Sequence, residues 1–325
     1  MRQTTLKTLA GFFLIAQFHA GALAQQNDDA LEEENSGGVI QRYGRNAASL
    51  IESITVDSSS IPLLSDYSAV TDEVLKNPPD SDWLSWRRTQ DNLGFSNLDQ
   101  INRQTVSNLA LAWHQEVTPG NNMPTPLVRD GVMFLYSAGD VVLALDATNG
   151  ELLWRYSHDG DATTSHKFGI ALYENKVLVP TSDLHMVALD ARTGDVIWDH
   201  TINVDDSIGH ALRSAPTIAG GQVIQGMAAS FVPGGGFIIA IDLESGRETW
   251  RFNTLAKPDE PGGNTWNNIP LEERQGGSVW NTGSYDAELD LLFYGVSPTY
   301  NTGPLLYPLG IDGVNNDALY TNSTL

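Results

Sequence analysis

Few side chains in this 325-residue sequence have the type and spacing for acid–base or metal chemistry. The 7 histidines show no His-x-x-His or His-Glu-x-x-His spacing, so no histidine metal site is indicated. The absence of cysteine excludes thiolate zinc, iron–sulfur ligation, disulfides and cysteine nucleophiles. There is no Gly-x-Ser-x-Gly elbow and no P-loop, and the glycine run 234–236 is flanked by strand-like segments, which favours a hairpin turn. The 8 tryptophans remain, and several of them recur at regular spacing.

That spacing belongs to an internal repeat. Residues 144–154, 188–198 and 240–250 share one pattern, in which alanine, aspartate, glycine and tryptophan occupy the same four positions. In each copy an alternating apolar strand ends at the aspartate, whose carboxylate can accept backbone N–H bonds in a tight turn. The glycine supplies a positive φ, and a second strand ends in the tryptophan. We therefore expect Trp154, Trp198 and Trp250 to pack between neighbouring sheets.

A second strand pair precedes each copy, so one repeat holds four strands. These upstream pairs lie at residues 125–135, 170–179 and 215–224, with turns that carry Asp-Gly, Glu-Asn or Gly-Gly. Four strands in about 40–50 residues is the period of a β-propeller blade, so the fold class is all-β. Trp113 lies one period earlier, where we expect it to close a sheet, and a weaker unit without a closing tryptophan covers residues 284–295.

The blade count predicts an incomplete propeller of four to five blades. The sequence ends in the apolar strand 316–325, a strand that leads into an Asp-turn-Gly-Trp hairpin in the other units. A propeller avoids open sheet faces by closing its ring. The open edges are therefore expected either to stay exposed or to be covered by another chain.

The N-terminal segment 1–24 is predicted to be a signal peptide. It has a basic start at Arg2 and Lys7, the apolar run 9–18 and a small-residue cleavage pattern that ends at Ala24. The apolar run is shorter than the ~20 residues of a membrane span, which disfavours an anchor. We expect cleavage after Ala24 and export to the periplasm, with no transmembrane segment.

Between the signal and the propeller, residues 25–69 are acidic and poor in aromatics, which predicts a flexible leader. A short helix is expected at 70–75, ended by the prolines that follow Asn77. The folded propeller region then covers residues 70–325. The formal net charge of −22 argues against nucleic acid or an anionic membrane as a partner.

The opening segment of this region, DWLSWRRTQDNLGFSNLDQINRQTVSNLALAW at residues 82–113, resembles the start of the pyrroloquinoline quinone (PQQ)-dependent alcohol dehydrogenases. The tryptophan repeats and residues 124–136, 276–295 and 315–325 resemble that family as well. Its members are periplasmic eight-bladed propellers about twice this length, so the resemblance implies an N-terminal half. It also implies that a small alcohol is oxidised to an aldehyde with PQQ, and that electrons pass to cytochrome c or another acceptor.

The resemblance implies a PQQ-binding or metal-binding role for individual residues of this sequence. Trp280 matches the tryptophan floor beneath PQQ, and Lys167, or alternatively Arg213, matches the arginine that pairs with a PQQ carboxylate. Calcium or a lanthanide ion is expected beside PQQ, yet Phe231 stands where the metal-binding glutamate should be, and Ser297 is the nearest match to the metal-binding asparagine. The catalytic residue is unknown, because the matching region follows the end of this sequence, and the family's vicinal cysteines are missing.

Several alternatives remain open at this point. The chain could be a non-catalytic propeller that scaffolds protein partners, or an inactive fragment. The polar stretch 300–302 or Asp312 could supply other metal ligands, although a surface loop is the default interpretation. In the loop 259–268, Trp266 could line the mouth of the propeller or anchor the loop.

Overall fold

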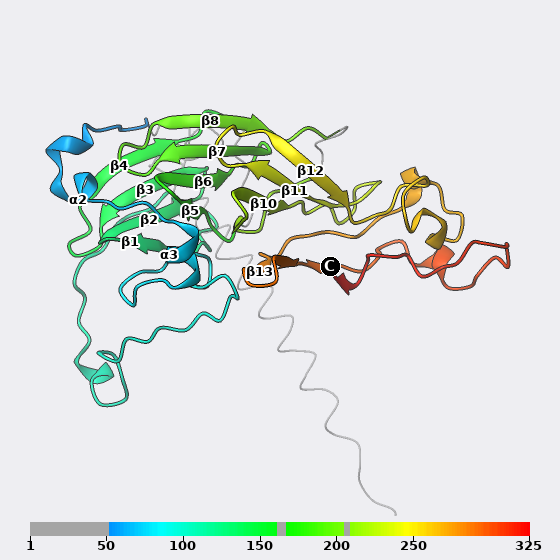
Figure 1. The fold of residues 1–325 in the computed structure, drawn as a ribbon, viewed down its shortest axis with the longest axis horizontal. Helices are drawn as coiled ribbons and strands as arrows, with labels where there is room; N and C mark the ends of the chain where they lie inside the picture. The colour runs from blue at the N-terminus through cyan, green and yellow to red at the C-terminus, as the bar shows by residue number, and fades with distance from the viewer. Residues whose placement is uncertain (1–51, 161–166, 205–208) are drawn as a thin grey trace, which may run out of the picture. The chain divides into compact units, whose positions relative to one another are not determined.

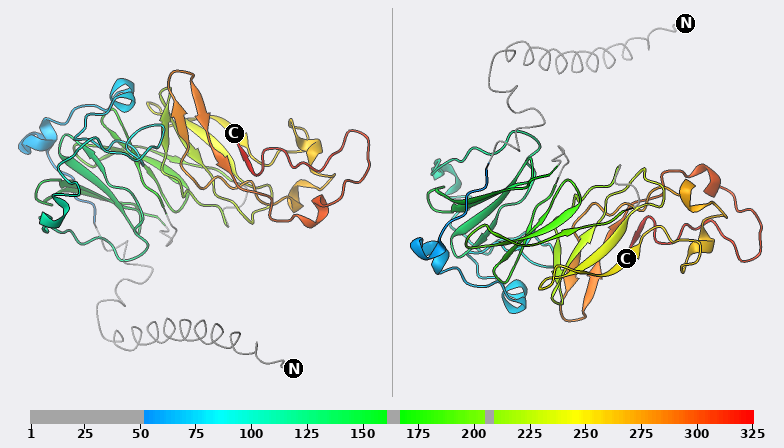
Figure 2. Two further views of the ribbon diagram at one scale, coloured as in Figure 1. Left: turned by 90° about the horizontal axis from the view of Figure 1, so that it is seen from below. Right: turned by 90° about the horizontal axis from the view of Figure 1, so that it is seen from above.

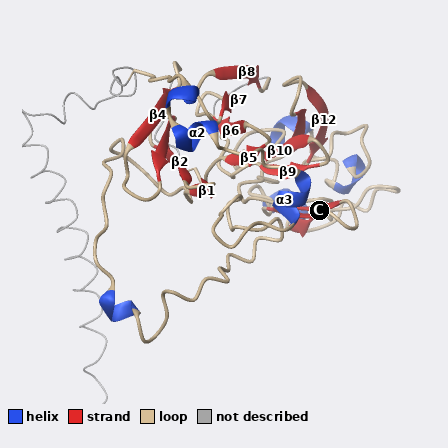
Figure 3. Ribbon diagram, turned by 60° about the vertical axis from the view of Figure 1, so that its left-hand side comes forward, coloured by secondary structure: helices blue, strands red, loops and turns tan. Residues whose placement is uncertain are grey.

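The computed structural model describes residues 52–160, 167–204 and 209–325, and most of the regular secondary structure in these ranges is β-strand (Figures 1 and 3). The predicted all-β fold is therefore confirmed. The expected signal peptide and the leader up to residue 51 lie outside the described residues. None of the helices that the structure describes is long and apolar enough to cross a membrane.

Three four-stranded antiparallel sheets form the body of the fold, each with its strands in sequence order. The first contains β1 (Leu127–Arg129), β2 (Val132–Ser137), β3 (Val141–Asp146) and β4 (Leu152–Ser157). The second contains β5 (Ala171–Tyr173), β6 (Lys176–Pro180), β7 (His185–Asp190) and β8 (Val196–Thr201). The third contains β9 (Thr217–Ala219), β10 (Gln222–Gly226), β11 (Phe237–Asp242) and β12 (Glu248–Asn253). Each sheet corresponds to one predicted repeat.

A fourth unit is partial within the described residues. It has the two-stranded pairs β13 (Ser284–Asp286) with β14 (Leu291–Phe293), and β15 (Gly295–Val296) with β16 (Ser323–Thr324). The short helices of the chain lie in connecting segments: η3 (Ser58–Ser60), α2 (Pro62–Ser65), α3 (Asp72–Lys76), η4 (Val106–Asn108), η5 (Gly263–Thr265), η6 (Leu271–Glu273) and η7 (Gly303–Leu305). The expected helix at 70–75 is thus α3, which Thr71 caps and which ends at Asn77.

The turn between the third and fourth strands has the predicted chemistry in all three sheets. In the second sheet the carboxylate of Asp190 accepts the N–H of Arg192 at 2.8 Å, and its carbonyl accepts the N–H of Gly194 at 2.9 Å. Gly194 has φ +80°, a left-handed conformation that glycine adopts without steric cost. Each sheet also has a bulge directly after the alanine of the repeat.

Tryptophans join neighbouring units through these turns. Trp113, Trp154 and Trp198 each donate the indole N–H to a turn carbonyl of the next unit, at 3.1, 3.0 and 3.1 Å. A Cβ added at the turn glycine would lie within 2.6–2.9 Å of the docked indole, so only glycine fits beneath it. Packing between sheets is therefore confirmed for Trp154 and Trp198. Trp113 docks in the same way, but the segment around it forms no strand in the described structure. Packing between sheets is not found for Trp250, which is 37% exposed and donates its indole N–H to Gln222 of its own sheet.

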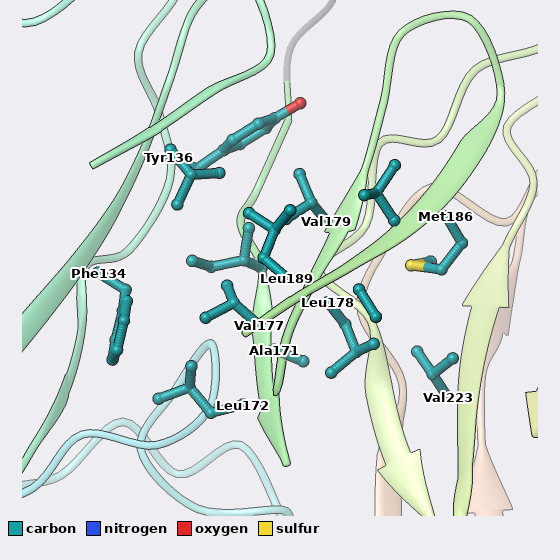
Figure 4. Packing of buried hydrophobic residues seen from close by; sticks show 14 of the residues in the cluster. Phe134, Tyr136, Ala171, Leu172, Val177, Leu178, Val179, Met186, Leu189 and Val223 are labelled. Atoms are coloured by element: carbon teal, nitrogen blue, oxygen red, sulfur yellow. The ribbon is translucent and has the colours of Figure 1, made fainter. Parts of the chain in front are cut away.

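The core lies between the faces of the sheets, and the second sheet is covered on both sides (Figures 2 and 4). All five residues of β6 are buried, as expected for a strand with apolar neighbours on both faces. Phe134 of the first sheet, Leu178 of the second and Val223 of the third belong to one continuous apolar cluster. The apolar side chains buried between neighbouring sheets therefore stabilise the stacking of the sheets.

The N-terminal segment 52–92 forms a strap that contacts all four units. It makes bridges between Ile54 and Arg155 of the first sheet and between Val70 and Glu174 of the second. Farther along, the side-chain amide of Gln90 donates to the carbonyl of Ile218 in β9, and the backbone carbonyl of Gln90 accepts the N–H of Tyr285 in β13.

This strap changes the expected boundary of the flexible leader. Within residues 52–69, Leu64 and Tyr67 are at most 1% exposed, and both belong to the main core. The segment is acidic overall, but these two apolar side chains tie it to the sheets. Ordered packing therefore begins before residue 70.

Candidate functional site

The segments that precede the first strand of each sheet meet one another. The N–H of Thr125, before β1, donates to the carbonyl of Phe168, before β5, at 3.2 Å. The N–H of Phe168 donates in turn to the carbonyl of Arg213, before β9, at 2.9 Å. Trp280 occupies the corresponding place before β13. The inner ends of all four units thus converge, as the blades of a propeller do at its axis.

Trp280 presents an exposed aromatic surface at this convergence. Its side chain is 43% exposed, whereas Trp154, docked between sheets, is fully buried. The ring of Phe168 lies 6.1 Å from that of Trp280, centre to centre, and Trp86 of the strap lies 5.7 Å from Phe168. Sequence reasoning missed Phe168 and Trp86, because only the fold brings them beside Trp280. The cluster can stack a flat ligand on the free face of the indole.

Arg213 is joined to this aromatic cluster through its backbone, because its carbonyl accepts the N–H of Phe168. Its side chain is half-buried, and its guanidinium makes no hydrogen bond or ion pair within the part of the chain that the structure describes. A guanidinium presents several N–H donors in a plane and can bind a carboxylate with two hydrogen bonds. Arg213 is therefore suited to hold an anionic group of a ligand that stacks on Trp280.

Lys167, the other predicted cation, is used elsewhere. Its ammonium group is buried, donates to the carbonyl of Pro180 at 2.6 Å and lies 3.5 Å from the carboxylate of Asp140. Burial lowers the pKa of Lys167 to about 8, although the charge of Asp140 counteracts this effect. These contacts hold the first and second sheets together, so Arg213 is the cation that remains free for a ligand.

The predicted metal ligands do not form a charged site. The hydroxyl of Ser297 is buried and accepts the N–H of Ser278 at 2.8 Å. Phe231 is 72% exposed, and its ring lies 4.9 Å from that of Tyr300. No group of three or more acidic or histidine side chains within the described ranges could hold a metal ion. Calcium and lanthanides require several hard oxygen ligands, so Ser297 and Phe231 do not fit a metal site. The residues that fit a ligand are Trp280 and Arg213, which suit a planar anion.

A cleft of about 680 Å³ opens beside Phe231. Phe237 and Arg251 line it as well, with the guanidinium 4.2 Å from the centre of the Phe237 ring. Its volume lies in the range of small-molecule sites. Trp266 does not face such an opening: it is 1% exposed and packs with Leu255, so it anchors its loop rather than lining a mouth.

A buried polar network connects the first and second sheets, and sequence reasoning missed it. The Nδ1 of His158 lies 2.9 Å from the hydroxyl of Tyr156, and its Nε2 lies 2.9 Å from Asp183. Burial alone would lower the pKa of His158, but the hydrogen bond and charge of Asp183 outweigh it and raise the pKa. For Asp183, burial is likewise outweighed by hydrogen bonds from His158 and Thr181, which lower its pKa.

Four-stranded sheets joined face to face by docked tryptophans, with first strands that converge on one site, define a β-propeller protein. The sequence profile described as "PQQ: Glucose/ethanol/alcohol dehydrogenase, beta-propeller domain" matches residues 83–323. The chain belongs to this family, as the resemblance predicted. By resemblance, membership supports PQQ and an accompanying metal ion as cofactors.

Named relatives agree with this assignment. The chain is 32% identical over 259 residues to "Quinohemoprotein alcohol dehydrogenase ADH-IIG" of Pseudomonas putida. This match covers 74% of this chain and 36% of that protein. It is 32% identical over 314 residues to "Alcohol dehydrogenase (quinone), dehydrogenase subunit" of Gluconacetobacter polyoxogenes, with 85% of this chain and 42% of that protein covered. The chain thus spans about two fifths of the length of these relatives.

Solved structures give the same fold. The quinohemoprotein alcohol dehydrogenase ADHIIG of Pseudomonas putida HK5 has a TM-score of 0.62 and 31% identity, over 70% of this chain and 36% of that one. A europium-containing methanol dehydrogenase has a TM-score of 0.63 and 26% identity, over 70% of this chain and 44% of that one.

Proposed function

We propose that this chain is the PQQ-binding part of an exported quinoprotein that oxidises a small alcohol to an aldehyde. One observation carries the proposal: an exposed indole, Trp280, lies where the inner ends of four units converge, and the unpaired guanidinium of Arg213 comes from the neighbouring unit. A planar polycarboxylate matches both features, and family membership makes PQQ the candidate.

The residues of this chain would bind and orient rather than transfer protons. Trp280 would support one face of the ring system, Phe168 would limit its sideways movement, and Arg213 would pair with a carboxylate. PQQ, when bound, supplies a two-electron acceptor for the alcohol. No described acid or histidine lies in this cluster, so we assign no catalytic base to it.

Location and acceptor belong to the proposal as well. The predicted signal peptide, cleaved after Ala24, would place the protein in the periplasm. There a cytochrome c or a quinone would accept the electrons, as the names of the quinohemoprotein and quinone-dependent relatives suggest.

Titration of the purified chain with PQQ tests the proposal. We expect quenching of tryptophan fluorescence that saturates at one PQQ per chain, and reduction of an artificial electron-accepting dye when a short alcohol is added. Saturable binding without dye reduction would support the binding role and reject catalysis by this chain alone. No saturable quenching would reject the proposed function.

A second candidate is a non-catalytic propeller that scaffolds protein partners. Phe231 and Ser297 favour it, because neither supplies the charge that a catalytic metal ion requires. Capture of a periplasmic protein by the immobilised chain, together with no PQQ binding, would support this candidate over the first.

A further inference from the structure

Lys167 directly precedes Phe168 in the sequence, and its side chain is fixed in the joint between the first and second sheets. The ammonium group donates to the carbonyl of Pro180, the last residue of β6, at 2.6 Å and lies 3.5 Å from the carboxylate of Asp140, which precedes β3. The side chains of Lys167 and Asp140 are 6% and 2% exposed. A buried charge without its counter-ion is costly, so these contacts hold the ammonium group at one position.

The carboxylate that faces Lys167 is itself held by both sheets. Asp140 accepts the N–H of Ser182, which follows β6, at 2.6 Å, and it accepts the hydroxyl of Tyr136 in β2. The oxygen of that hydroxyl also lies 3.0 Å from the carbonyl oxygen of Pro180. Because the partners of Lys167 contact one another, they form a fixed receiver for its ammonium group.

The segment that carries Phe168 has an anchored side chain on one side only. The N–H of Phe168 donates to the carbonyl of Arg213, and its carbonyl accepts the N–H of Thr125. The next residue, Gly169, has no side chain and lies at φ +149°, where side chains are rarely tolerated. It contributes no packing that would fix the ring of Phe168. Lys167, on the other side of Phe168, contributes the buried anchor, so a displacement of Lys167 is expected to move Phe168.

We propose that Lys167 is a positioning residue of the PQQ site, which holds Phe168 beside Trp280 and does not itself bind the cofactor. The inference rests on the proposed function, because it concerns the same aromatic cluster. The ring of Phe168 lies 6.1 Å from that of Trp280, so a shift of the segment would move it along the stacking surface. If Lys167 turned toward a PQQ carboxylate instead, Asp140 would stay buried without its cation, whereas Arg213 can bind the carboxylate without such a loss.

Three variants test the position of Phe168 in the chain without PQQ. Lys167→Met and Asp140→Asn each break the pair, whereas the double variant removes both charges and should recover most of the stability that the single variants lose. The chain is labelled with 5-fluorotryptophan, and the signal of Trp280 in the fluorine NMR spectrum is the one that Trp280→Phe lacks. We expect this signal to shift in Lys167→Met and in the double variant, toward its position in Phe168→Leu.

Lys176→Met is the matched control for this measurement. Lys176 lies at the opposite end of β6 from Pro180, its side chain is 10% exposed, and it pairs with Glu174 at 2.6 Å. The loss of this second buried lysine should leave the fluorine signal of Trp280 unchanged. An unchanged signal in Lys167→Met, or an equal shift in Lys176→Met, would overturn the inference.

Titration with PQQ separates positioning from direct binding. If Lys167 positions Phe168, Lys167→Met and Asp140→Asn should each weaken PQQ binding at least threefold. If the ammonium group bound PQQ directly, Asp140→Asn would release it for the ligand and tighten binding, which would overturn the inference. No saturable binding of PQQ by the wild type would reject the proposed function, while the fluorine spectra would still decide whether Lys167 positions Phe168.

Discussion

At the scale of single residues, the candidate site depends on two side chains that the fold leaves unused. Most polar groups of the described chain have partners: Lys167 bonds to Pro180 and Asp140, and Ser297 to Ser278. Trp280 keeps an exposed indole face, and Arg213 keeps an unpaired guanidinium. An exposed aromatic face and an unpaired cation can bind a ligand that offers a flat ring and an anionic group, so these residues point to binding.

Replacement of Trp280 should separate stacking from folding. Because Trp280 is 43% exposed, Trp280→Ala should lower the free energy of unfolding by less than ~1 kcal/mol. The same variant should weaken PQQ binding at least tenfold, because the stacking surface is lost. Trp280→Phe, which keeps a flat ring, should retain most of the affinity. Isothermal titration with PQQ and urea denaturation of each variant measure the two effects. Equal affinity of the wild type and Trp280→Ala would place PQQ elsewhere.

Binding of PQQ should not depend on a metal ion, because Phe231 and Ser297 carry no charge toward the site. We expect the dissociation constant to change less than twofold between buffers that contain calcium, lanthanum or EDTA. Fluorescence quenching in the three buffers measures it. A loss of tenfold or more in EDTA would mean that other side chains hold an ion beside the quinone.

The ion pair of His158 with Asp183 should make stability depend on pH in a defined direction. The pKa of His158 is raised in the folded state, so the pair stabilises the fold below the ordinary histidine pKa, and this contribution is lost as pH rises through the folded value. His158→Gln should therefore lower the free energy of unfolding more at pH 5.5 than at pH 9. Urea denaturation at both pH values tests this. In the Asp183→Asn background, His158→Gln should lower the free energy of unfolding equally at the two pH values.

At the scale of strands and turns, the sequence predicts those features that residues close together in the chain determine. The aspartate, glycine and tryptophan positions of each repeat define a turn, so three hairpins and the docking of Trp154 and Trp198 followed from spacing alone, whereas the docking expected for Trp250 is not found in the described residues. The network of His158 with Asp183 could not be predicted, since its members come from different hairpins and no spacing relates them. Residues 52–69 were misjudged because their composition is that of a leader, whereas Leu64 and Tyr67 anchor them in the core.

A comparison of two tryptophans at the same repeat position should measure the contribution of docking. Trp154 is fully buried on the turn of the second sheet, so Trp154→Ala should cost about 3–5 kcal/mol of unfolding free energy. Trp250 covers no turn glycine among the described residues and is 37% exposed, so Trp250→Ala in this chain should cost about 1 kcal/mol or less. Chemical denaturation of both variants tests this. Similar losses would mean that packing within its own sheet, rather than docking, stabilises each tryptophan.

At the scale of the whole molecule, the units are held together by the indoles and by the strap of residues 52–92. The indoles act only between consecutive units, as nearest-neighbour contacts do in repeat proteins. The strap also connects units that are not consecutive, because it contacts the first sheet at Ile54 and the fourth unit at Tyr285. Two separate sets of contacts therefore fix the angle between sheets, on which the convergence of the segments that carry Arg213, Phe168 and Trp280 depends.

The buried ion pair of Asp82 with Arg129 is the test of this role, since it joins the strap to β1. The two charged groups lie 2.7 Å apart, with side chains 3% and 8% exposed. Asp82→Ala removes the nearer of the two counter-ions of the buried guanidinium, since Asp130 stays 3.4 Å away, and should cost about 2–3 kcal/mol of unfolding free energy. The control is Glu288→Ala: its carboxylate pairs with Lys76 of the strap at 3.7 Å, and both side chains are exposed, so the loss should stay below ~1 kcal/mol.

If the strap sets the geometry of the site, Asp82→Ala should also weaken PQQ binding under conditions where the variant is still folded. Asp82 is in the strap and contacts neither Trp280 nor Arg213 in any recorded bond, so a direct effect on the ligand is not expected. Circular dichroism establishes the folded fraction, and titration with PQQ gives the affinity per folded chain. Undiminished affinity would show that the indoles alone hold the sheets at the required angle, and that the strap adds stability without shaping the site.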